Sequence, residues 1–236
     1  MYFYELHLHT AETSRCGGSP AADMVRTYKE KGFTGVVITD HFVNGNCYAR
    51  DVEDWQEKID IFVRGYNAAI EEGDRIGLKV YFGLEFTYLG AGEDYLTLGL
   101  TESHLRHELA GCADWPLEKY VDEVHKLGGI IIRAHPYRRA FYIEHPGQQR
   151  PGLPIDAIEV FNGGNRAEDF NREALQMALR DNKPMVAGSD THNVNTTATD
   201  YVGFEEDPAD YAALCQAIKD RKTFLVHKTR QEYLDP

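Results

Sequence analysis

The chain has 236 residues, of which 42% are hydrophobic, and its 25 basic and 38 acidic residues give a formal net charge of -13. This length and apolar content fit one large domain with a substantial core, so we expect a single domain over residues 1–236. The negative charge disfavours general attraction to nucleic acid, because that affinity comes largely from cations that neutralise phosphates. We expect no nucleic-acid partner beyond a small nucleotide.

No segment resembles a membrane span or a targeting signal. The chain has no run of about 18 apolar residues, and its first residues lack a basic stretch followed by an apolar one. The four cysteines are widely spaced and form no Cys-x-x-Cys pair, which argues against disulfides or a thiolate zinc site. We therefore expect a cytoplasmic protein with free thiols and no membrane partner.

The predicted elements alternate between strands and helices. Strands are predicted at 5–10, 35–39, 78–84, 95–100, 129–133, 155–161, 184–187 and 223–226. Helices are predicted at 20–31, 55–73, 116–127, 166–180 and 211–219. A loop rich in Arg, Tyr, Gly and Pro covers 137–154. This order calls for a parallel sheet, and about seven such units favour closure into an α/β barrel.

The first predicted strand carries two histidines, His7 and His9, separated by one residue. Alternate side chains of an extended strand point to the same face, so both imidazoles would project into one space. Such a pair is half of a metal site. Taken alone, it is equally compatible with a surface strand that happens to carry two histidines.

Further residues that can bind metals follow later strands. At or just past the ends of predicted strands lie His41, Glu85, His135, Asp190 and His192. Active sites of α/β barrels are built at the C-terminal ends of the strands. Each residue alone could be an ordinary loop, turn or capping residue, but scattered polar residues have no reason to select the same end of successive strands. The sequence therefore predicts one metal centre at this end of the barrel.

The predicted ligands suit particular ions and a particular chemistry. Imidazoles and carboxylates without thiolate fit Zn, Mn or Fe, and a carboxylate can bridge two such ions. Two or three divalent ions close together would lower the pKa of bound water and neutralise the oxygens of a phosphoryl group. Phosphate esters can be hydrolysed in this way without a nucleophilic side chain.

Five blocks of sequence together resemble the PHP (polymerase and histidinol phosphatase) superfamily of metal-dependent phosphoesterases. The blocks are His7-x-His9, Ile38-Thr39-Asp40-His41, Gly83-Leu84-Glu85, Ala134-His135-Pro136 and Gly188-Ser189-Asp190-Thr191-His192. They occur in order between residues 5 and 192. The resemblance implies an α/β fold, a distorted TIM-like (β/α)7 barrel, with up to three metal ions in a cleft at the strand ends.

The resemblance also implies the ligands of two ions. His7, His9, Glu85 and Asp190 look like the ligands of one metal. Glu85 looks like the bridge to a second ion, which His135 binds. Many relatives complete this second site with a histidine after the fourth strand, but residues 98–101 offer none.

Two histidines follow shortly after that fourth strand. His104 and His107 could substitute in the second site, although their spacing fits an exposed helix at least as well. The sequence leaves both interpretations open.

The third site is where the chain departs from the family pattern. His41 and His192 look like ligands of a third ion, and Asp40 looks like a catalytic-centre residue that orients ligands. Some relatives place a further ligand shortly after the first His-x-His. In this chain Glu12 is the expected ligand there, whereas Arg15 would suit a substrate phosphate.

Basic residues near His135 suggest how a substrate binds. Arg133, Arg138 and Arg139 flank this histidine, and guanidinium groups bind phosphate oxygens in a bidentate manner. We expect Arg138 to contact a small phosphorylated substrate. The alternative is that its side chain is an ordinary solvated charge on a loop. Asn162 follows another strand and either points into the same cleft or belongs to a turn.

The expected function is metal-dependent hydrolysis of a small phosphate ester, either a phosphomonoester or a small nucleotide. Two other interpretations are a metal-dependent amidohydrolase, whose barrels also open with His-x-His, and a non-catalytic metal-binding regulatory module. The position of Glu85 and the ending Gly188-Ser189-Asp190-Thr191-His192 favour the phosphoesterase.

Overall fold

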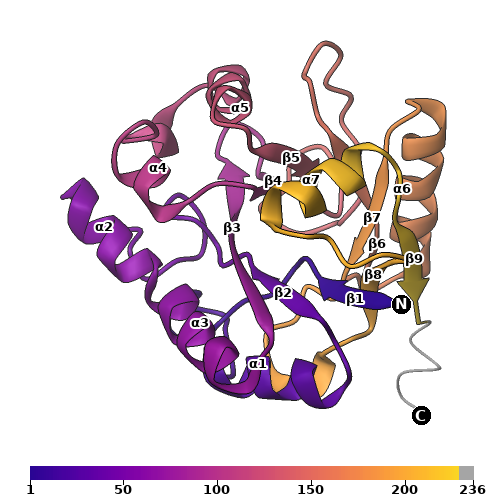
Figure 1. Ribbon diagram of the computed structural model, residues 1–236. Helices are drawn as coiled ribbons and strands as arrows, with labels where there is room; N and C mark the ends of the chain where they lie inside the picture. The colour runs from indigo at the N-terminus through magenta and orange to yellow at the C-terminus, as the bar shows by residue number, and fades with distance from the viewer. Residues whose placement is uncertain (229–236) are drawn as a thin grey trace.

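One mixed sheet organises residues 1–228, the part of the chain that the computed structural model describes (Figure 1). Its nine strands lie in the order β7-β6-β5-β4-β3-β2-β1-β8-β9. The strands are β1 (Tyr2–Glu5), β2 (Gly35–Ile38), β3 (Lys79–Tyr88), β4 (Glu93–Leu98), β5 (Ile130–Arg133), β6 (Ala157–Asn162), β7 (Met185–Gly188), β8 (Asp200–Phe204) and β9 (Phe224–His227). The α-helices are α1 (Ala21–Glu30), α2 (Trp55–Phe62), α3 (Arg64–Ile76), α4 (Glu102–Arg106), α5 (Leu117–Lys126), α6 (Glu168–Arg180) and α7 (Tyr211–Lys219). Two short 3-10 helices are η1 (Cys112–Asp114) and η2 (Val194–Thr196).

The first seven strands close into a barrel at a seam between β1 and β7. Leu8, just beyond β1, pairs in parallel with Thr191, just beyond β7. The His9 backbone N–H donates to the Thr191 carbonyl at 2.9 Å. The predicted distorted TIM-like barrel is therefore confirmed. On the other edge of β1, the strand β8, which the sequence analysis did not predict, pairs in antiparallel orientation and is followed by β9.

The prediction of a parallel sheet is wrong at β4. This strand runs antiparallel to both β3 and β5. The reason is the short turn at residues 89–92, which ends in Gly92 at a φ of 69°. A turn of this length permits only a hairpin, because a parallel crossover needs a dozen or more residues. The hairpin also moves the start of β4 to Glu93, two residues before the predicted start.

The long helix predicted at 55–73 is two helices, α2 and α3. The Thr13 hydroxyl donates to the Phe62 carbonyl at 2.9 Å and accepts from the Gly65 N–H at 3.0 Å. This side chain therefore replaces helical hydrogen bonds at the junction. A Cβ on Gly65 would lie 2.0 Å from the Thr10 hydroxyl oxygen, so the start of α3 packs directly against the loop that follows His9.

Apolar side chains fill the barrel below the predicted metal centre, and α7 lies across the barrel on the near side in Figure 1. The Tyr211 hydroxyl of α7 donates to the Phe82 carbonyl at 2.6 Å, and its ring stacks on Tyr81. The buried residues of this core are Tyr4, Leu6, Val37, Leu96, Leu98, Ile130, Ile132, Ala134, Ala157, Val186, Val202, Phe204, Leu214, Cys215 and Ile218. The apolar core fills one end of the barrel, and the predicted ligands lie at the other, open end.

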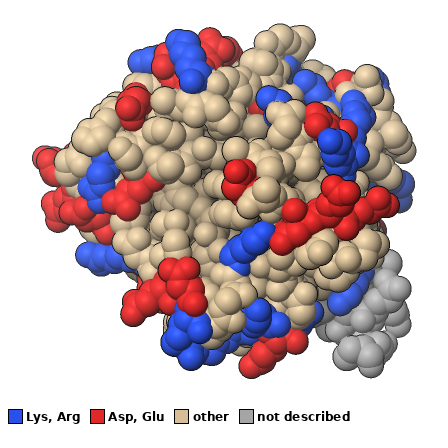
Figure 2. All heavy atoms as spheres, viewed as in Figure 1, with Lys and Arg blue, Asp and Glu red and all other residues tan. Residues whose placement is uncertain are grey.

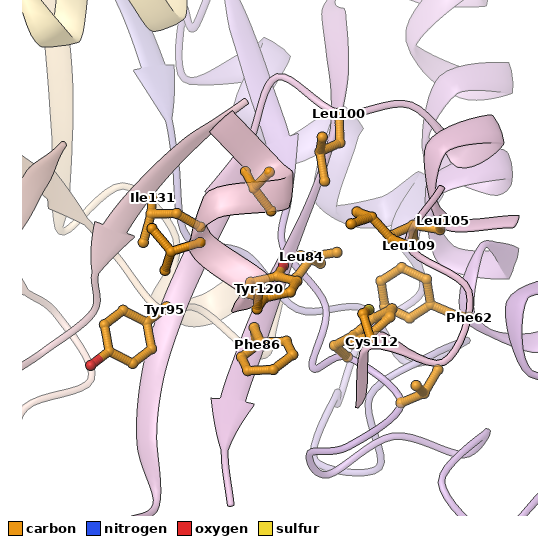
Figure 3. Close-up of a cluster of buried hydrophobic side chains, with 14 of the residues drawn as sticks. Phe62, Leu84, Phe86, Tyr95, Leu100, Leu105, Leu109, Cys112, Tyr120 and Ile131 are labelled. Atoms are coloured by element: carbon orange, nitrogen blue, oxygen red, sulfur yellow. The ribbon is translucent and has the colours of Figure 1, made fainter. Parts of the chain in front are cut away.

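A second core packs helices against the outside of β3 and β4 (Figure 3). Its centre is the stacked pair of Phe86 and Tyr120, whose ring centroids are 3.9 Å apart. The Tyr120 hydroxyl lies 2.8 Å from the Thr97 hydroxyl, so its polar group is paired. This packing fixes the β3–β4 hairpin, which carries part of the candidate site.

The surface on the α7 side carries acidic and basic side chains interspersed with uncharged ones (Figure 2). None of the helices within residues 1–228 has the length and apolarity needed to span a lipid bilayer.

Candidate metal centre

The predicted ligands converge at the open end of the barrel. His7 and His9 follow β1, His41 follows β2, Glu85 lies within β3, and His135 follows β5. Asp190 and His192 follow β7. All of these side chains are buried except those of His41 and His192, which are partly exposed.

The Glu85 carboxylate lies at the middle of this cluster. Its Oε1 is 3.2 Å from His7 Nε2 and 3.0 Å from His135 Nε2. Its Oε2 is 2.6 Å from His41 Nδ1 and 3.6 Å from His9 Nε2. One carboxylate therefore contacts four imidazoles from three separate segments of the chain.

Asp190 connects the first two histidines on the opposite side of the cluster. Its Oδ1 lies 3.1 Å from His9 Nε2 and 3.4 Å from His7 Nε2. Two groups of donors whose atoms lie within 4.8 Å of one another result, namely His7 with His9 and Glu85, and His7 with His135 and Asp190. Together the two groups contain the four ligands expected for the first ion and also His135, which was expected at the second ion.

A carboxylate that the sequence analysis missed completes another group. Asp94 at the start of β4 lies with Glu85 and His135 in a set of donor atoms within 4.8 Å of one another. Asp94 Oδ2 is 3.8 Å from His135 Nε2. The family pattern predicts a histidine for this site, and the position of Asp94 follows from the sequence only if β4 is recognised as part of a hairpin.

The two histidines after β4 lie elsewhere. His104 Nδ1 accepts from the Thr101 N–H at 3.2 Å, and the Thr101 hydroxyl accepts from the His104 N–H at 3.4 Å. This reciprocal pair is a capping box at the start of α4. His104 therefore belongs to a helix, α4, as one of the two interpretations expected. His107 follows the last residue of this helix, Arg106.

A third group consists of His9, His41 and His192, whose donor atoms also lie within 4.8 Å of one another. The ring centroid of His9 is 4.4 Å from those of both His41 and His192. Burial opposes the ionisation of the neighbouring Cys16 thiol, but His192 and His41 lower its pKa to about 6. Cys16 is not one of the three grouped donors, and the sequence analysis did not single it out from the other cysteines.

Glu12, the expected ligand in this region, points elsewhere. Both of its carboxylate oxygens accept from the Ala21 backbone N–H at 3.0 Å. Pro20 at the helix start provides no side-chain cap, so Glu12 caps α1 in its place. Arg15 also turns outward, and its Nη2 lies 2.5 Å from Asp51 on the surface. The structure therefore corrects both expectations for these residues.

Two buried carboxylates hold the donors in position. Asp40 accepts from the Thr10 N–H at 2.7 Å and from the Ser14 hydroxyl at 2.6 Å. Ser14 Oγ in turn accepts from the His41 N–H at 3.0 Å and lies 3.3 Å from His9 Nδ1. Asp40 therefore orients the loop that carries ligands, as expected of a residue outside the ligand set.

The second positioning carboxylate, Glu159, was not predicted. Its Oε1 lies 2.9 Å from His7 Nδ1, and its Oε2 accepts from the His135 N–H at 2.9 Å. The Asn162 amide donates to Glu159 Oε2 at 2.8 Å, so Asn162 does face this cluster. Glu159 lies inside β6 rather than past its end, and the search at strand ends could not find it.

Arg138 is the flanking arginine that enters the cleft. Its Nη2 donates to Asp190 Oδ2 at 2.6 Å and to Asn162 Oδ1 at 2.7 Å, and its Nε donates to Asn165 at 3.2 Å. Arg133 turns away and pairs with Glu93 at 2.8 Å. Arg138 therefore both fixes Asp190 and borders the space above the donors.

The ionisation of the carboxylates favours cation binding. Burial opposes the charged form of Glu85, but His41 and His7 hold its pKa well below the usual range. Burial likewise opposes the charge on Asp190, but His7 and Arg138 hold its pKa well below the usual range. Both groups are therefore anionic, which is the form that binds a metal.

The histidines show two opposite effects. Burial, together with His41 and His192, lowers the pKa of His9 well below its usual value, so this imidazole is neutral. Burial also opposes the charge on His7, but carboxylates led by Asp190 raise its pKa well above the usual value. The excess of negative charge around His7 thus attracts either a proton or a metal ion.

The donors fit a metal site by another criterion. Six buried side-chain polar atoms of residues 1–228 make no hydrogen bond of suitable geometry, and four of them lie in this cluster, although two of these, His41 Nδ1 and Glu85 Oε2, are 2.6 Å apart. The four atoms are His7 Nε2, His9 Nε2, His41 Nδ1 and Glu85 Oε2. A buried polar atom without a partner costs about 1–3 kcal/mol, and a cation between these atoms would remove that cost.

The backbone around the cluster is also unusual. His135 and Asp190 have φ angles of 26° and 48°, in a region that residues other than glycine rarely adopt. Such conformations cluster at functional sites, where surrounding contacts hold them. A cleft of about 550 Å³ opens above the donors and is bordered by His41, Asp94 and Arg138.

Fold and site together define a metal-dependent hydrolase built on an α/β barrel. The sequence model of the PHP domain matches residues 5–153, and the model described as PHP-associated matches residues 168–223. The chain therefore belongs to the PHP domain family, as its motifs predicted. Comparison with curated protein sequences gave no match.

Several solved structures share this fold. A two-domain protein from Bacteroides vulgatus, described as containing a predicted PHP-like metal-dependent phosphoesterase, has a TM-score of 0.70 and 19% identity over 100% of this chain and 68% of its own. PsfC from Pseudomonas syringae has a TM-score of 0.64 and 16% identity over 100% and 96% of the two chains. An amidohydrolase from Chromobacterium violaceum with bound sulfate and no metal has a TM-score of 0.58 and 14% identity over 97% and 99%.

Proposed function

We propose that the protein hydrolyses small phosphate esters, either phosphomonoesters or small nucleotides, with two or three divalent ions of Zn, Mn or Fe. The observation that carries this proposal is the position of Glu85 between donors of all the groups described above. A carboxylate shared in this way suits neighbouring ions, and neighbouring ions suit a phosphoryl group, which carries several negative oxygens.

Each ion would have its own donors. His7, His9, Glu85 and Asp190 would hold the first, and Glu85, Asp94 and His135 the second. Ions held there would lower the pKa of a water molecule and neutralise charge on a phosphoryl group. Asp94 thus takes the place of the histidine that many relatives have at the second site.

The third set differs from the expected one. We assign it to His9, His41 and His192, and we add Cys16, whose thiol pKa these neighbouring imidazoles lower. Cys16 replaces Glu12, whose carboxylate caps α1. A thiolate donor favours Zn over Mn at this position, because sulfur is a softer ligand than oxygen.

Side chains of the protein supply the remaining requirements. Within residues 1–228, Arg138 uses Nε and Nη2 to bind other side chains, which leaves Nη1 for a substrate oxygen. Since its guanidinium is already held in place, little side-chain entropy is lost when a phosphate binds. Asp40 and Glu159 keep the imidazoles in orientation.

A second candidate function is amide hydrolysis. The similar fold of the Chromobacterium violaceum amidohydrolase keeps this alternative open, while the sulfate in that protein is a tetrahedral anion like phosphate. The two activities differ in the charge of the substrate. Phosphate monoesters carry about two negative charges at neutral pH, which a centre of several cations and Arg138 would favour over a neutral amide.

The test combines metal analysis with a substrate panel. Protein loaded with Zn or Mn should bind at least two ions per chain and hydrolyse members of a panel of phosphomonoesters and small nucleotides. Fewer than one ion per chain would contradict the metal centre. Full metal loading with hydrolysis of amides alone would favour the amidohydrolase, and loading with no hydrolysis at all would favour the regulatory module.

A further inference from the structure

Exposed apolar side chains gather beside the candidate site. Seven large hydrophobic residues of the described chain are exposed, and three of them border the cleft above the donors. These three are Leu89, Tyr142 and Phe141, whose side chain is fully exposed. Apolar groups gathered at one place on a surface mark a binding surface rather than chance exposure.

The three residues belong to one wall built from two segments. Leu89 lies in the turn between β3 and β4, and the other two lie in the loop after β5. The Glu144 N–H donates to the Ala91 carbonyl at 3.1 Å. A Cβ on Gly92 would lie 1.8 Å from the Tyr142 carbonyl oxygen, so only glycine permits this contact between the segments. The turn therefore supports the loop.

The wall changes in polarity with depth. Phe141 forms its outer end, and its ring lies edge to face against Tyr142 at 5.5 Å. Tyr142 is less exposed than Phe141, and its hydroxyl is neutral at neutral pH. Arg138 and Asp94 border the inner part of the same cleft. The order from outside to inside is thus apolar ring, neutral phenol, and charged groups.

The rest of the cleft lining is largely polar and includes Asn44, Asn46 and Arg50, together with Cys16. A ligand in this cleft therefore meets large apolar side chains only at Leu89, Phe141 and Tyr142. A flat apolar group matches this surface better than a polyol does, because a polyol would lose hydrogen bonds to water against Phe141 and Leu89.

We propose that the substrate carries an aromatic or heteroaromatic group that packs against Phe141 and Leu89 while its phosphate lies at the donors. This inference rests on the proposed function and adds the chemical class of the group esterified to phosphate. The aromatic ring would stack or lie edge to face on Phe141, as Tyr142 already does from within the chain.

The first measurement compares two esters on metal-loaded protein. Phe141→Ala should raise KM for 1-naphthyl phosphate by about tenfold, with kcat little changed, because the apolar contact is equal in ground and transition states. KM for glycerol phosphate should stay unchanged. Phe141→Tyr should retain the wild-type KM for the naphthyl ester. Leu179→Ala, which removes an exposed apolar side chain from α6, away from the cleft lining, is the control.

A binding measurement separates this inference from the proposed function. Phenylphosphonate and methylphosphonate present the same anion with and without a ring, and their affinities for metal-loaded protein can be measured by calorimetry. Phenylphosphonate should bind more tightly to the wild type, and Phe141→Ala should remove that difference. Equal binding of both would overturn the aromatic inference alone. Binding of neither would overturn the proposed function and the inference together.

Discussion

Glu85 is the single residue that contacts most of the candidate ligands. Glu85→Gln keeps the size of the side chain but removes the charge that the four neighbouring imidazoles face. We expect the loss of at least one bound ion per chain and a decrease in kcat of about 100-fold or more, with the fold retained. Metal analysis would measure the ion content, steady-state kinetics the kcat, and circular dichroism the fold.

The control for this variant is Glu72→Gln. Glu72 is also largely buried, but it pairs with Arg26 on α1 and Arg75 on α3 and belongs to none of the donor groups. Its substitution should leave metal content unchanged. Wild-type metal content in Glu85→Gln would refute the bridging role.

Cys16 predicts a measurable pH dependence. Burial opposes its ionisation, but hydrogen bonds with His192 and His41 lower the pKa of the thiol to about 6. Burial instead raises the pKa of Cys47 and Cys215 to about 12. In metal-free protein, iodoacetamide should therefore modify Cys16 first, at a rate that rises as the pH increases through about 6, because the thiolate is the nucleophile.

Metal loading should protect Cys16 if its thiolate is a ligand. In Cys16→Ser the rapid modification should disappear, and one ion should be bound more weakly. Cys47→Ser, which changes a neighbouring thiol on the loop after β2, should alter neither result. Unprotected Cys16 in fully loaded protein would contradict its assignment to the third ion.

Most of the residues found from sequence share one property. His7, His41 and His135 each follow a strand closely, so strand prediction located them. Glu85 lies within β3, but the block Gly83-Leu84-Glu85 identified it. Asp94 and Glu159 also lie within strands and belong to no such block, so these buried carboxylates are recognised only when their partners are known. The partners come from other segments, and no local pattern of the sequence records which segments meet.

At the scale of elements, the stability of α1 tests whether Glu12 is a helix cap or a metal ligand. If Glu12 is a helix cap, Glu12→Ala should lower the free energy of unfolding by about 1 kcal/mol, the usual cost of losing a side-chain cap. Metal content should not change. Denaturant titration of the metal-free protein measures the first effect, and loss of an ion in the variant would restore Glu12 as a ligand.

The helices and strands were predicted well where their own periodicity decides them. The helix at 211–219 has the predicted limits of α7, and the β-branched run at 35–39 forms β2. The division between α2 and α3 could not be predicted, because it depends on a hydroxyl from Thr13 far back in the chain. The β3–β4 hairpin was missed because the predicted strands at 78–84 and 95–100 left a long connection, whereas β3 continues to Tyr88 and β4 begins at Glu93.

At the scale of the whole molecule, ions should stabilise the barrel by connecting its strands. The donors come from segments after β1, β2, β5 and β7 and from within β3 and β4. A ligand that binds only the folded state at a concentration 1,000 times its Kd adds about 4 kcal/mol of stability. We therefore expect a higher melting temperature with Zn or Mn than with chelator, measured by scanning calorimetry.

Glu85→Gln again provides the comparison. Its melting temperature should respond less to added metal than that of the wild type, because one bridging charge is gone. Equal melting temperatures with and without metal for the wild type would show that the donors do not hold ions in the folded state.

The seam between β1 and β7 also has a consequence for the order of folding. Leu8 and Thr191 pair across nearly the whole chain, and each is flanked by donors of the metal centre. Contacts between distant parts of a chain form late, because a long loop must close first. During synthesis, His7 and His9 emerge first and must remain without their Asp190 partner until almost all of the barrel has been made. The newly made chain therefore exposes a pair of metal-binding imidazoles long before it can enclose an ion.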